Sequence, residues 1–190
     1  MAAEEKYLAL LNPNASDTVT DAIARAASAY QGAGLPIRCI TSKAGPMGIE
    51  SDQDVSDAIS PMLALAGERE KDALGFIVAC YSDPGLSELR AQSAHPVIGI
   101  QEASVSMALA SGRRFGVAAI LPASVERQRR SFTSTGVGAR WAGSRALGLG
   151  VAELADAGIT MDRLISIGRE LKEKDGADVV ILGCAGMSDY

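Results

Sequence analysis

Short apolar segments alternate with helical segments along most of this 190-residue chain. The apolar segments are rich in Val, Ile, Leu and Phe, which is typical of buried β-strands. Strands separated by helical segments are joined by crossovers, so neighbouring strands run parallel. The sequence therefore predicts an α/β fold in which helices flank parallel sheets. The expected strands are Tyr7–Leu11, Pro36–Ile40, Gly75–Cys80, Pro96–Ile100, Phe115–Leu121 and Asp178–Cys184.

Two of the intervening segments carry apolar residues at helical spacing. The first places on one helix face Val19, Ile23, Ala27 and Tyr30. The second places on one helix face Met161, Leu164, Ile165, Gly168 and Leu171. We expect both to be amphipathic crossover helices. The stretch from Gly136 to Gly150 is rich in Gly and Ala and predicts no particular element.

A weak internal repeat divides the chain into two halves. The segment ending at Cys80 reads GFIVAC and the one ending at Cys184 reads VVILGC, while LLNP and AILP form a second pair at a similar spacing. We expect two pseudo-symmetric α/β lobes, residues 1–112 with Cys80 and residues 113–190 with Cys184. The second half stops soon after its cysteine, so we expect it to lack a closing strand and helix. Either the sequence is cut short there, or a neighbouring subunit of a homo-oligomer covers the exposed edge.

The composition excludes several classes of partner. The formal net charge is -5, and no Lys/Arg-rich block is present that would hold a nucleic acid or an anionic membrane. The apolar runs are far shorter than the ~20 residues that cross a bilayer, and the acidic start lacks the layout of a signal peptide. Three cysteines without a close pair and one histidine argue against a disulfide framework and a metal site. We expect a cytoplasmic protein that acts on a small molecule.

Each repeated cysteine stands at the carboxyl end of an apolar strand, which is the edge where open α/β sheets bind ligands. Ser82, Asp83 and Pro84 follow Cys80, and they predict a helix that begins at Pro84 with Ser82 or Asp83 as its N-cap. A thiol beside a helix N-terminus has a pKa below its free value of about 8.5. We therefore expect a lowered pKa for Cys80.

Two thiols in one cleft favour a particular kind of chemistry. A lone cysteine is most often a small buried hydrophobe, but two at equivalent points of a repeat indicate function. A disulfide would need close Cα atoms, and a single nucleophile would need a base, for which the chain offers only His95 at the start of its strand. Two thiols on opposite faces of a carbon can instead remove a proton from one face and return it on the other. Fixed N–H groups can stabilise the enolate, so no cofactor is needed.

Five segments carry a resemblance to a known family. They read NPNAS from Asn12, GPMGIES from Gly45, ACYSDPGL from Ala79, PVIGIQEA from Pro96 and GCAGM from Gly183. Together they resemble the hydantoin and allantoin racemases of the aspartate/glutamate racemase superfamily. The match extends over essentially the whole chain, and the two cysteine motifs in order are its specific part.

The resemblance implies a cofactor-independent racemase that inverts the C5 stereocentre of a 5-substituted hydantoin or allantoin in a cleft between two lobes. It implies Cys80 and Cys184 as the acid/base pair. It also implies substrate contacts from Asn14, Pro46, Tyr81, Ser82, Ala119, Gly183, Ala185 and Gly186. Family members commonly carry two threonines where this chain has Ala119 and Ile120, so the chain departs from the pattern beside the ligand.

Other polar and sulfur-bearing residues have structural interpretations. We interpret Cys39 as core, Asp83 and Glu102 as groups at helix starts, and the run from Arg127 to Arg130 as a solvated helix face. Asn14 fits an Asx turn as well as a ligand contact. Three alternatives to a hydantoin-type racemase stay open: a racemase of acidic amino acids, a one-cysteine decarboxylase and a non-catalytic binding homologue. A racemase of acidic amino acids would need cationic groups to bind the additional substrate carboxylate, and no Arg or Lys stands in a cysteine motif.

Overall fold

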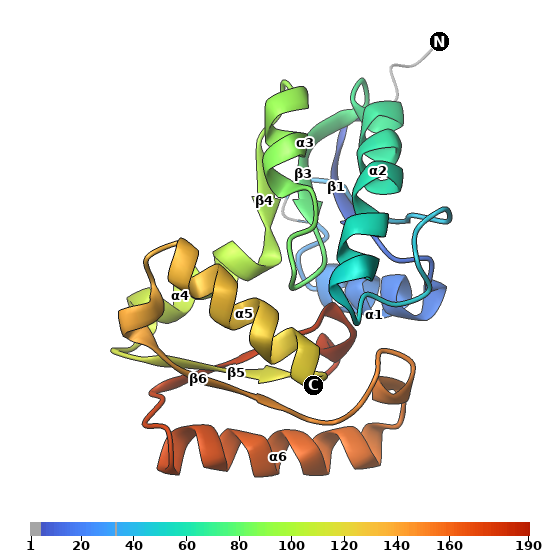
Figure 1. The fold of residues 1–190 in the computed structure, drawn as a ribbon. Coiled ribbons are helices and arrows are strands. Elements are labelled where there is room, and N and C mark those ends of the chain that lie inside the picture. The colour runs from blue at the N-terminus through green and yellow to red at the C-terminus, as the bar shows by residue number, and fades with distance from the viewer. Residues whose placement is uncertain (1–4, 33) are drawn as a thin grey trace.

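The computed structural model describes residues 5–32 and 34–190, and the strands in this part of the chain form two sheets (Figure 1). The strands are β1 (Tyr7–Asn12), β2 (Ile37–Thr41), β3 (Ala73–Val78), β4 (Val97–Gly99), β5 (Phe115–Ala119), β6 (Trp141–Ala146) and β7 (Val179–Leu182). The helices are α1 (Asp17–Ser28), α2 (Asp52–Arg69), α3 (Leu86–Gln92), α4 (Ile100–Ser111), α5 (Pro122–Ser134) and α6 (Ala157–Glu173). Three short 3-10 turns complete the order: η1 (Gly138–Arg140), η2 (Glu153–Ala155) and η3 (Ala185–Met187).

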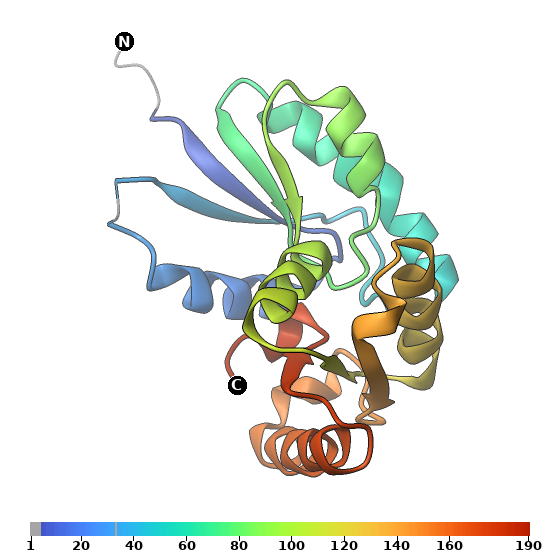
Figure 2. The same ribbon diagram turned by 90° about the vertical axis from the view of Figure 1, so that its left-hand side faces the viewer.

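The two sheets have the same strand arrangement around their central strands. The first sheet has the order β2-β1-β3-β4, the second has the order β6-β5-β7, and every neighbouring pair is parallel. The strands that end next to Cys80 and Cys184 are β3 and β7, which hold equivalent places. This confirms the predicted α/β fold with parallel sheets. Figure 2 shows the strands of the first sheet converging toward the second.

Helix α4 belongs to the first half by sequence but packs on the second sheet. Its residues Val105 and Ala108 share a core cluster with Phe115 and Val117 of β5. The first sheet has a separate core, in which Phe76 of β3 packs with neighbours from β1, α2 and α3. The link between the two sheets therefore runs through the short stretch where β4 passes directly into α4.

Strand β6 lies inside the stretch from Gly136 to Gly150, where the sequence predicted no element. It is an edge strand, and all six of its residues are half-buried. Because neither face of the strand is fully covered, its apolar and polar residues need not alternate, and they do not alternate in its sequence WAGSRA. Arg145 anchors it through ion pairs with Glu170 and Asp175.

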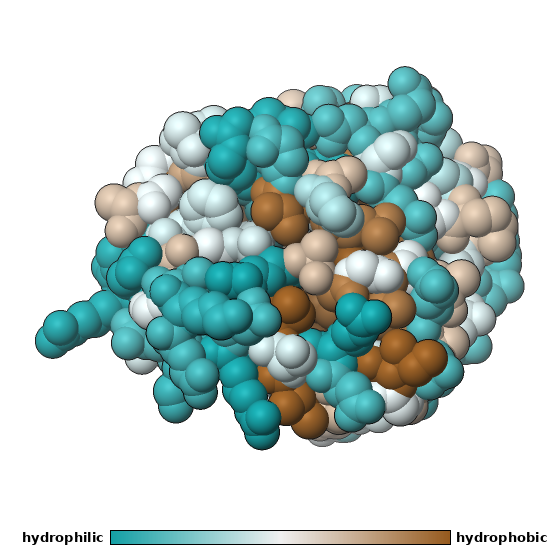
Figure 3. Space-filling model, turned by 60° about the horizontal axis from the view of Figure 1, so that its bottom comes forward, coloured by the Kyte–Doolittle hydropathy of each residue, from teal (hydrophilic) through white to brown (hydrophobic). Residues whose placement is uncertain are grey.

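The predicted helix faces are correct only in part. Val19, Ile23 and Ala27 of α1 are buried, but Tyr30 lies beyond the end of the helix and is exposed. On α6 the buried residues are Thr160, Leu164 and Leu171. Met161 and Ile165 are exposed instead, because the sheet covers a narrower stripe of the helix than the apolar residues occupy. Figure 3 brings this side of the molecule forward and shows apolar patches between hydrophilic side chains.

An almost wholly apolar groove lies on the first sheet. It has a volume of about 520 Å³ and is floored by Leu8, Leu10 and Ile77, with α1 along one side. On the second sheet, Val180 and Leu182 of β7 are each more than a third exposed. Within the described ranges, no helix is both long and apolar enough to cross a membrane.

Candidate active site

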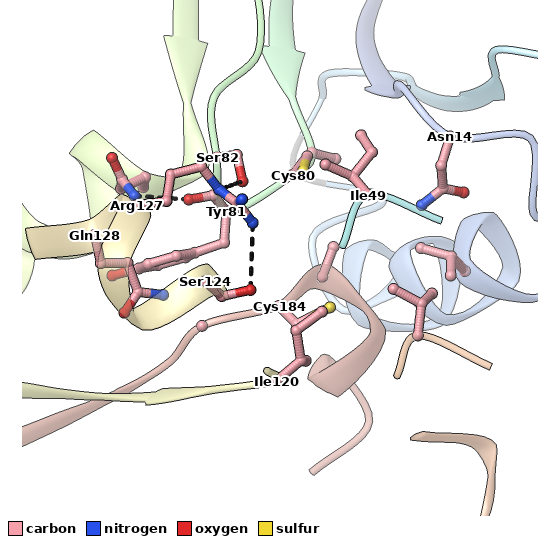
Figure 4. A pocket seen from close by; sticks show the side chains of 16 residues that line it. Asn14, Ile49, Cys80, Tyr81, Ser82, Ile120, Ser124, Arg127, Gln128 and Cys184 are labelled. Carbon is pink, nitrogen blue, oxygen red and sulfur yellow. Dashed lines mark hydrogen bonds between the residues drawn. The ribbon is translucent and has the colours of Figure 1, made fainter. Parts of the chain in front are cut away.

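Cys80 and Cys184 line one pocket between the two sheets (Figure 4). Both are free thiols. The first half contributes Asn14 and Ile49 to the walls, and α5 of the second half contributes Arg127. The enclosed space is about 30 Å³, far below the ~300–1,000 Å³ of an ordinary ligand pocket. A substrate can therefore enter only when side chains at the mouth move apart.

Gly183 lets the Cys184 segment pass close to the neighbouring strand. A Cβ atom at this position would lie 2.9 Å from the carbonyl oxygen of Ala118 and 2.7 Å from Cγ1 of Val117. Both contacts are too short for a real side chain, and the first is to backbone that cannot rotate away. The glycine therefore fixes the position of Cys184, since any larger residue would push the thiol out of place.

Burial raises the pKa of Cys80 to about 11, so the predicted lowering is wrong. The Asp83 carboxylate also raises this pKa, while the backbone N–H of Ser82, the Arg127 charge and the Ser82 hydroxyl lower it. The expected helix dipole is missing because α3 begins only at Leu86, with Gly85 as its N-cap. Five residues separate the thiol from that helix, and the dipole effect acts only within the first turn.

Cys184 has the higher pKa of the two thiols, about 12. Burial is again the main cause, and the backbone N–H of Gly186 opposes it. The charges of Cys80 and Glu50 raise this pKa further. Both sulfurs line the same pocket. Each thiol thus has a backbone N–H two residues further along the chain, at Ser82 and at Gly186.

Asp83 caps a helix, but not the one that the sequence predicted. Its carboxylate oxygens accept hydrogen bonds of 3.0 Å from the backbone N–H groups of Gln101 and Glu102, in the first turn of α4. Gly99 makes room, because a Cβ there would lie 2.3 Å from the carboxyl group. Burial raises the pKa of Asp83 to about 6 against the effect of these two hydrogen bonds. The carboxylate therefore joins the Cys80 loop to the start of α4.

We expect replacing Asp83 with alanine to lower the free energy of unfolding by about 1–2 kcal/mol, since an N-terminal cap is lost. Replacing Asp83 with asparagine keeps a side chain of similar shape but removes the carboxyl group that titrates. The folded pKa of about 6 lies above the ordinary 3.8, so this carboxyl stabilises the fold below pH 4 and the contribution is lost as pH rises through 6. Urea unfolding should therefore show wild type losing about 2–3 kcal/mol of stability relative to Asp83→Asn between pH 4 and 7. A constant difference would contradict the buried carboxylate.

Asn14 forms the predicted Asx turn and also lines the pocket. Its Oδ1 accepts hydrogen bonds from Nδ2 of Asn12 at 2.9 Å and from the backbone N–H of Ser16 at 3.0 Å. Two donors at one end of the amide identify that end as oxygen, so Nδ2 is the other end. Figure 4 shows this nitrogen on the side of the two cysteines. Asn14 thus presents a hydrogen-bond donor to the pocket.

Arg127 is not part of a solvated helix face, contrary to the prediction. Its side chain is only 13% exposed, whereas that of Arg130 is 47% exposed. Arg127 donates to the hydroxyls of Ser82 and Ser124 and forms an ion pair with Asp52. The sequence did hold one indication that Arg127 could reach the pocket. Helix α5 begins three residues after β5 ends, which puts its start at the ligand-binding edge of the sheet.

The structure places most of the other predicted contacts at the pocket. Tyr81, Ser82, Gly183 and Ala185 line it together with Asn14 and the cysteines. Three predicted contacts lie elsewhere. Pro46 holds a nearby loop by accepting a hydrogen bond from Ala15, Ala119 is fully buried in β5, and Gly186 lines an adjoining groove. Sequence reasoning missed these wall residues: Val19, Ile49, Ser124, Gln128 and Val151.

The remaining singled-out residues have structural surroundings. Cys39 on β2 packs against the cluster of α1 residues, and burial raises its pKa. Glu102 pairs with Arg90 at the start of α4, and the His95 ring hydrogen-bonds the backbone of Glu70. In the described part of the chain, no three His, Cys, Asp or Glu side chains are grouped so as to hold a metal ion.

Comparison with known proteins places the chain in a family. The sequence profile described as Asp/Glu/Hydantoin racemase matches residues 8–190. The hydantoin racemase of Rhizobium meliloti is 32% identical over 184 residues, covering 96% of this chain and 76% of that protein. The solved allantoin racemases of Klebsiella pneumoniae and Pseudomonas fluorescens both superpose with a TM-score of 0.91, at 31% and 26% identity; they cover 97% and 96% of this chain and 76% and 78% of their own. Together with the two parallel sheets and the pocket between them, these similarities establish that the chain belongs to the Asp/Glu/Hydantoin racemase family.

Proposed function

We propose that this protein is a cofactor-independent racemase that inverts the C5 stereocentre of a hydantoin-type ring by proton transfer between Cys80 and Cys184. One observation carries the proposal: two free thiols, set at equivalent strand ends of the two halves, line the same pocket. Two equivalent acid/base groups match a reaction whose two directions are mirror images. The R. meliloti relative and the two solved neighbours, named as hydantoin and allantoin racemases, support the ring class.

In the proposed reaction one sulfur is a thiolate and the other a thiol. The thiolate removes the C5 proton from one face of the ring, and the electron pair moves onto the C4 carbonyl oxygen. The other thiol then protonates C5 from the opposite face, which inverts the centre and leaves the charges exchanged. The backbone N–H groups of Ser82 and Gly186, each of which favours the charged form of its thiol, support whichever sulfur carries the charge.

The enolate oxygen also needs hydrogen-bond donors. Asn14 supplies one, since its Oδ1 is held by Asn12 and Ser16 and its Nδ2 lies at the pocket. A neutral donor fixed in place before the reaction stabilises developing charge without reorganisation, and such a donor typically contributes ~10²–10³-fold in rate. Asn14 therefore has the role of an enolate stabiliser in this proposal.

The substituent at C5 has space beside the cysteine pocket. A groove of about 610 Å³ shares Val19 and Val151 with the pocket and continues past Leu154. At its outer end the charges of Arg25 and Asp189 are paired with each other. An apolar substituent gains about 0.8 kcal/mol per buried CH₂ in such a groove, whereas a ureido group loses hydrogen bonds to water. We infer that 5-alkyl and 5-benzyl hydantoins are better substrates than allantoin.

The decay of circular dichroism tests both parts of this proposal. Enantiopure 5-isopropylhydantoin, 5-benzylhydantoin and allantoin are each incubated with the protein, and we expect the signal of the two apolar rings to decay at least about tenfold faster. Val151→Thr should narrow this preference, while Val137→Thr, in the core behind α5, serves as the control. No decay with any ring would refute the activity, and faster decay of allantoin would refute the substituent preference.

Racemisation of an acidic amino acid is the second candidate, and Arg127 is the observation that favours it. Its guanidinium supplies the cation that the cysteine motifs lack and that a substrate carboxylate would need. The Asp52 carboxylate already pairs with this cation, however, so a second anion gains less. We expect no deuterium uptake at Cα of glutamate or aspartate in heavy water, and uptake would reverse the ranking of the two candidates.

A further inference from the structure

The two thiols of the pocket have different charged neighbours. Cys80 is influenced by the Arg127 guanidinium from α5 and by the Asp83 carboxylate from its own loop. Cys184 is influenced by Cys80 and by the Glu50 carboxylate, which stands just before α2. Among the described residues, the charged side chains that act on the two sulfurs thus include one cation, and it is on the Cys80 side.

Arg127 is joined to the loop that carries Cys80 through Ser82, and all three residues line the pocket. Nε of Arg127 donates a hydrogen bond of 3.0 Å to Oγ of Ser82. A hydroxyl whose oxygen accepts one hydrogen bond keeps its own hydrogen for donation. Ser82 and Cys80 line the same pocket, and the Ser82 hydroxyl favours the charged form of the Cys80 thiol. The guanidinium therefore leaves the serine hydroxyl free to donate in the part of the pocket that holds Cys80.

Three partners hold the Arg127 guanidinium in one orientation. Besides its bond to Ser82, it donates to Oγ of Ser124 at 3.2 Å and pairs with Oδ1 of Asp52 at 3.1 Å. The group is largely shielded from solvent, so salt screens its charge weakly. The planar fork of an arginine fits such a set of acceptors, and a lysine ammonium cannot replace it.

We propose that Arg127 is a positioning residue of the racemase: through the Ser82 hydroxyl it stabilises negative charge on the Cys80 sulfur, so that Cys80 is the thiolate and Cys184 the thiol when one proton has left the pair. Its part in catalysis rests on the function proposed above. The enantiomer whose C5–H faces Cys80 then reacts with the singly ionised enzyme directly. The other enantiomer must wait until the proton has moved between the sulfurs.

Site-resolved alkylation tests the charge on each sulfur without any substrate. The intact protein is treated with iodoacetamide across a pH series, and mass spectrometry quantifies modification of Cys39, Cys80 and Cys184 separately. We expect Arg127→Gln to raise the apparent pKa of Cys80 by about one unit, which lowers its alkylation at pH 8 about tenfold. Cys39 should not change, and Cys184 should change less than Cys80. Arg130→Gln is the matched control, because Arg130 also pairs with Asp52 but is exposed to solvent.

Ser82 variants separate a relay from a direct effect of the Arg127 charge. Ser82→Ala should raise the pKa of Cys80 as Arg127→Gln does, and Ser82→Thr, which keeps a hydroxyl, should restore it. If the charge acts through the serine, the double variant should shift this pKa no further than the larger single shift. The proposal would be overturned if the two single pKa shifts added in full in the double variant. It would also be overturned if Arg127→Gln left the pH profile of Cys80 alkylation unchanged.

The alkylation experiment still tests the role of Arg127 if one variant fails to fold, and also if the protein turns over no substrate. If Arg127→Gln does not fold, the comparison of Ser82→Ala with Ser82→Thr still tests the relay, since each changes only a few atoms. Alkylation also does not depend on turnover. If no ring racemised but Arg127→Gln still raised the pKa of Cys80, the proposed function would be refuted and the effect of Arg127 on the thiol would stand. If the protein were an active racemase whose Cys80 alkylation profile did not change in Arg127→Gln, only the role of Arg127 would be refuted.

Discussion

Cys80→Ser and Cys184→Ser are each expected to abolish racemisation of both enantiomers, a loss of at least about 10³-fold in kcat. Inversion needs a proton removed on one face and delivered on the other, and a serine hydroxyl is far too weak an acid to replace a thiol. Each variant keeps one working sulfur, however. That sulfur can still remove the C5 proton of the enantiomer that faces it and return a solvent deuteron to the same face.

Deuterium uptake measured for each pure enantiomer in heavy water therefore distinguishes the two variants. We expect Cys80→Ser and Cys184→Ser to exchange opposite enantiomers with retained configuration. Cys39→Ser is the control, because this thiol lies on β2 outside the pocket, and it should racemise both enantiomers like wild type. Full racemisation by either pocket variant would remove that cysteine from the mechanism. If both variants exchanged the same enantiomer, the two thiols could not act on opposite faces of the ring.

The second large effect is on pH dependence: kcat/KM should rise about tenfold per pH unit between pH 7 and 10. The reacting form has one thiolate and one thiol, and burial raises the pKa of Cys80 to about 11 and that of Cys184 to about 12. Below these values most of the enzyme holds two thiols, so the active fraction grows as protons leave. Above them a second proton is lost and the rate should fall again.

An N3-methylated hydantoin is the appropriate substrate for this profile, because it lacks the N3–H, the most acidic hydrogen of the ring, and so stays neutral across this pH range. The uncatalysed racemisation at each pH is measured without enzyme and subtracted. Arg127→Gln should move the rising limb to higher pH, as its alkylation profile does. A rate that is flat between pH 7 and 10 would show that one thiol is already ionised at neutral pH, contrary to the burial seen here.

The architecture followed from the sequence because it depends on patterns of several residues. The apolar segments ending near Cys80 and Cys184 are predicted as parallel strands by their composition, and their similarity set them at equivalent places in two sheets. Asn14 was predicted as a turn for a local reason, since an Asx turn needs only its own neighbours along the chain. Local and periodic signals of this kind survive in a single sequence.

What the sequence could not predict depends on contacts between distant segments. Asp83 caps α4 rather than the helix that follows it, because the loop after β3 folds over the end of β4. Arg127 has the spacing of a surface residue, and only the approach of Ser82 and Asp52 from the first half buries it. The pKa of Cys80 was mispredicted for the same reason, since burial outweighs a helix dipole that lies too far away.

The small volume of the cysteine pocket implies that the proposed enzyme keeps, for a time after each turnover, the protonation state that the turnover left. Each inversion moves the charge to the other sulfur, so the form that releases the product enantiomer can deprotonate only that same enantiomer until the proton has moved back. Resetting needs protons to pass between the sulfurs through water, and the closed pocket of about 30 Å³ has room for very little. At high concentrations of one enantiomer, the next molecule arrives before the reset. Turnover should then slow as that concentration rises, while a racemic mixture, which uses each form as it appears, exchanges its C5 hydrogen without delay.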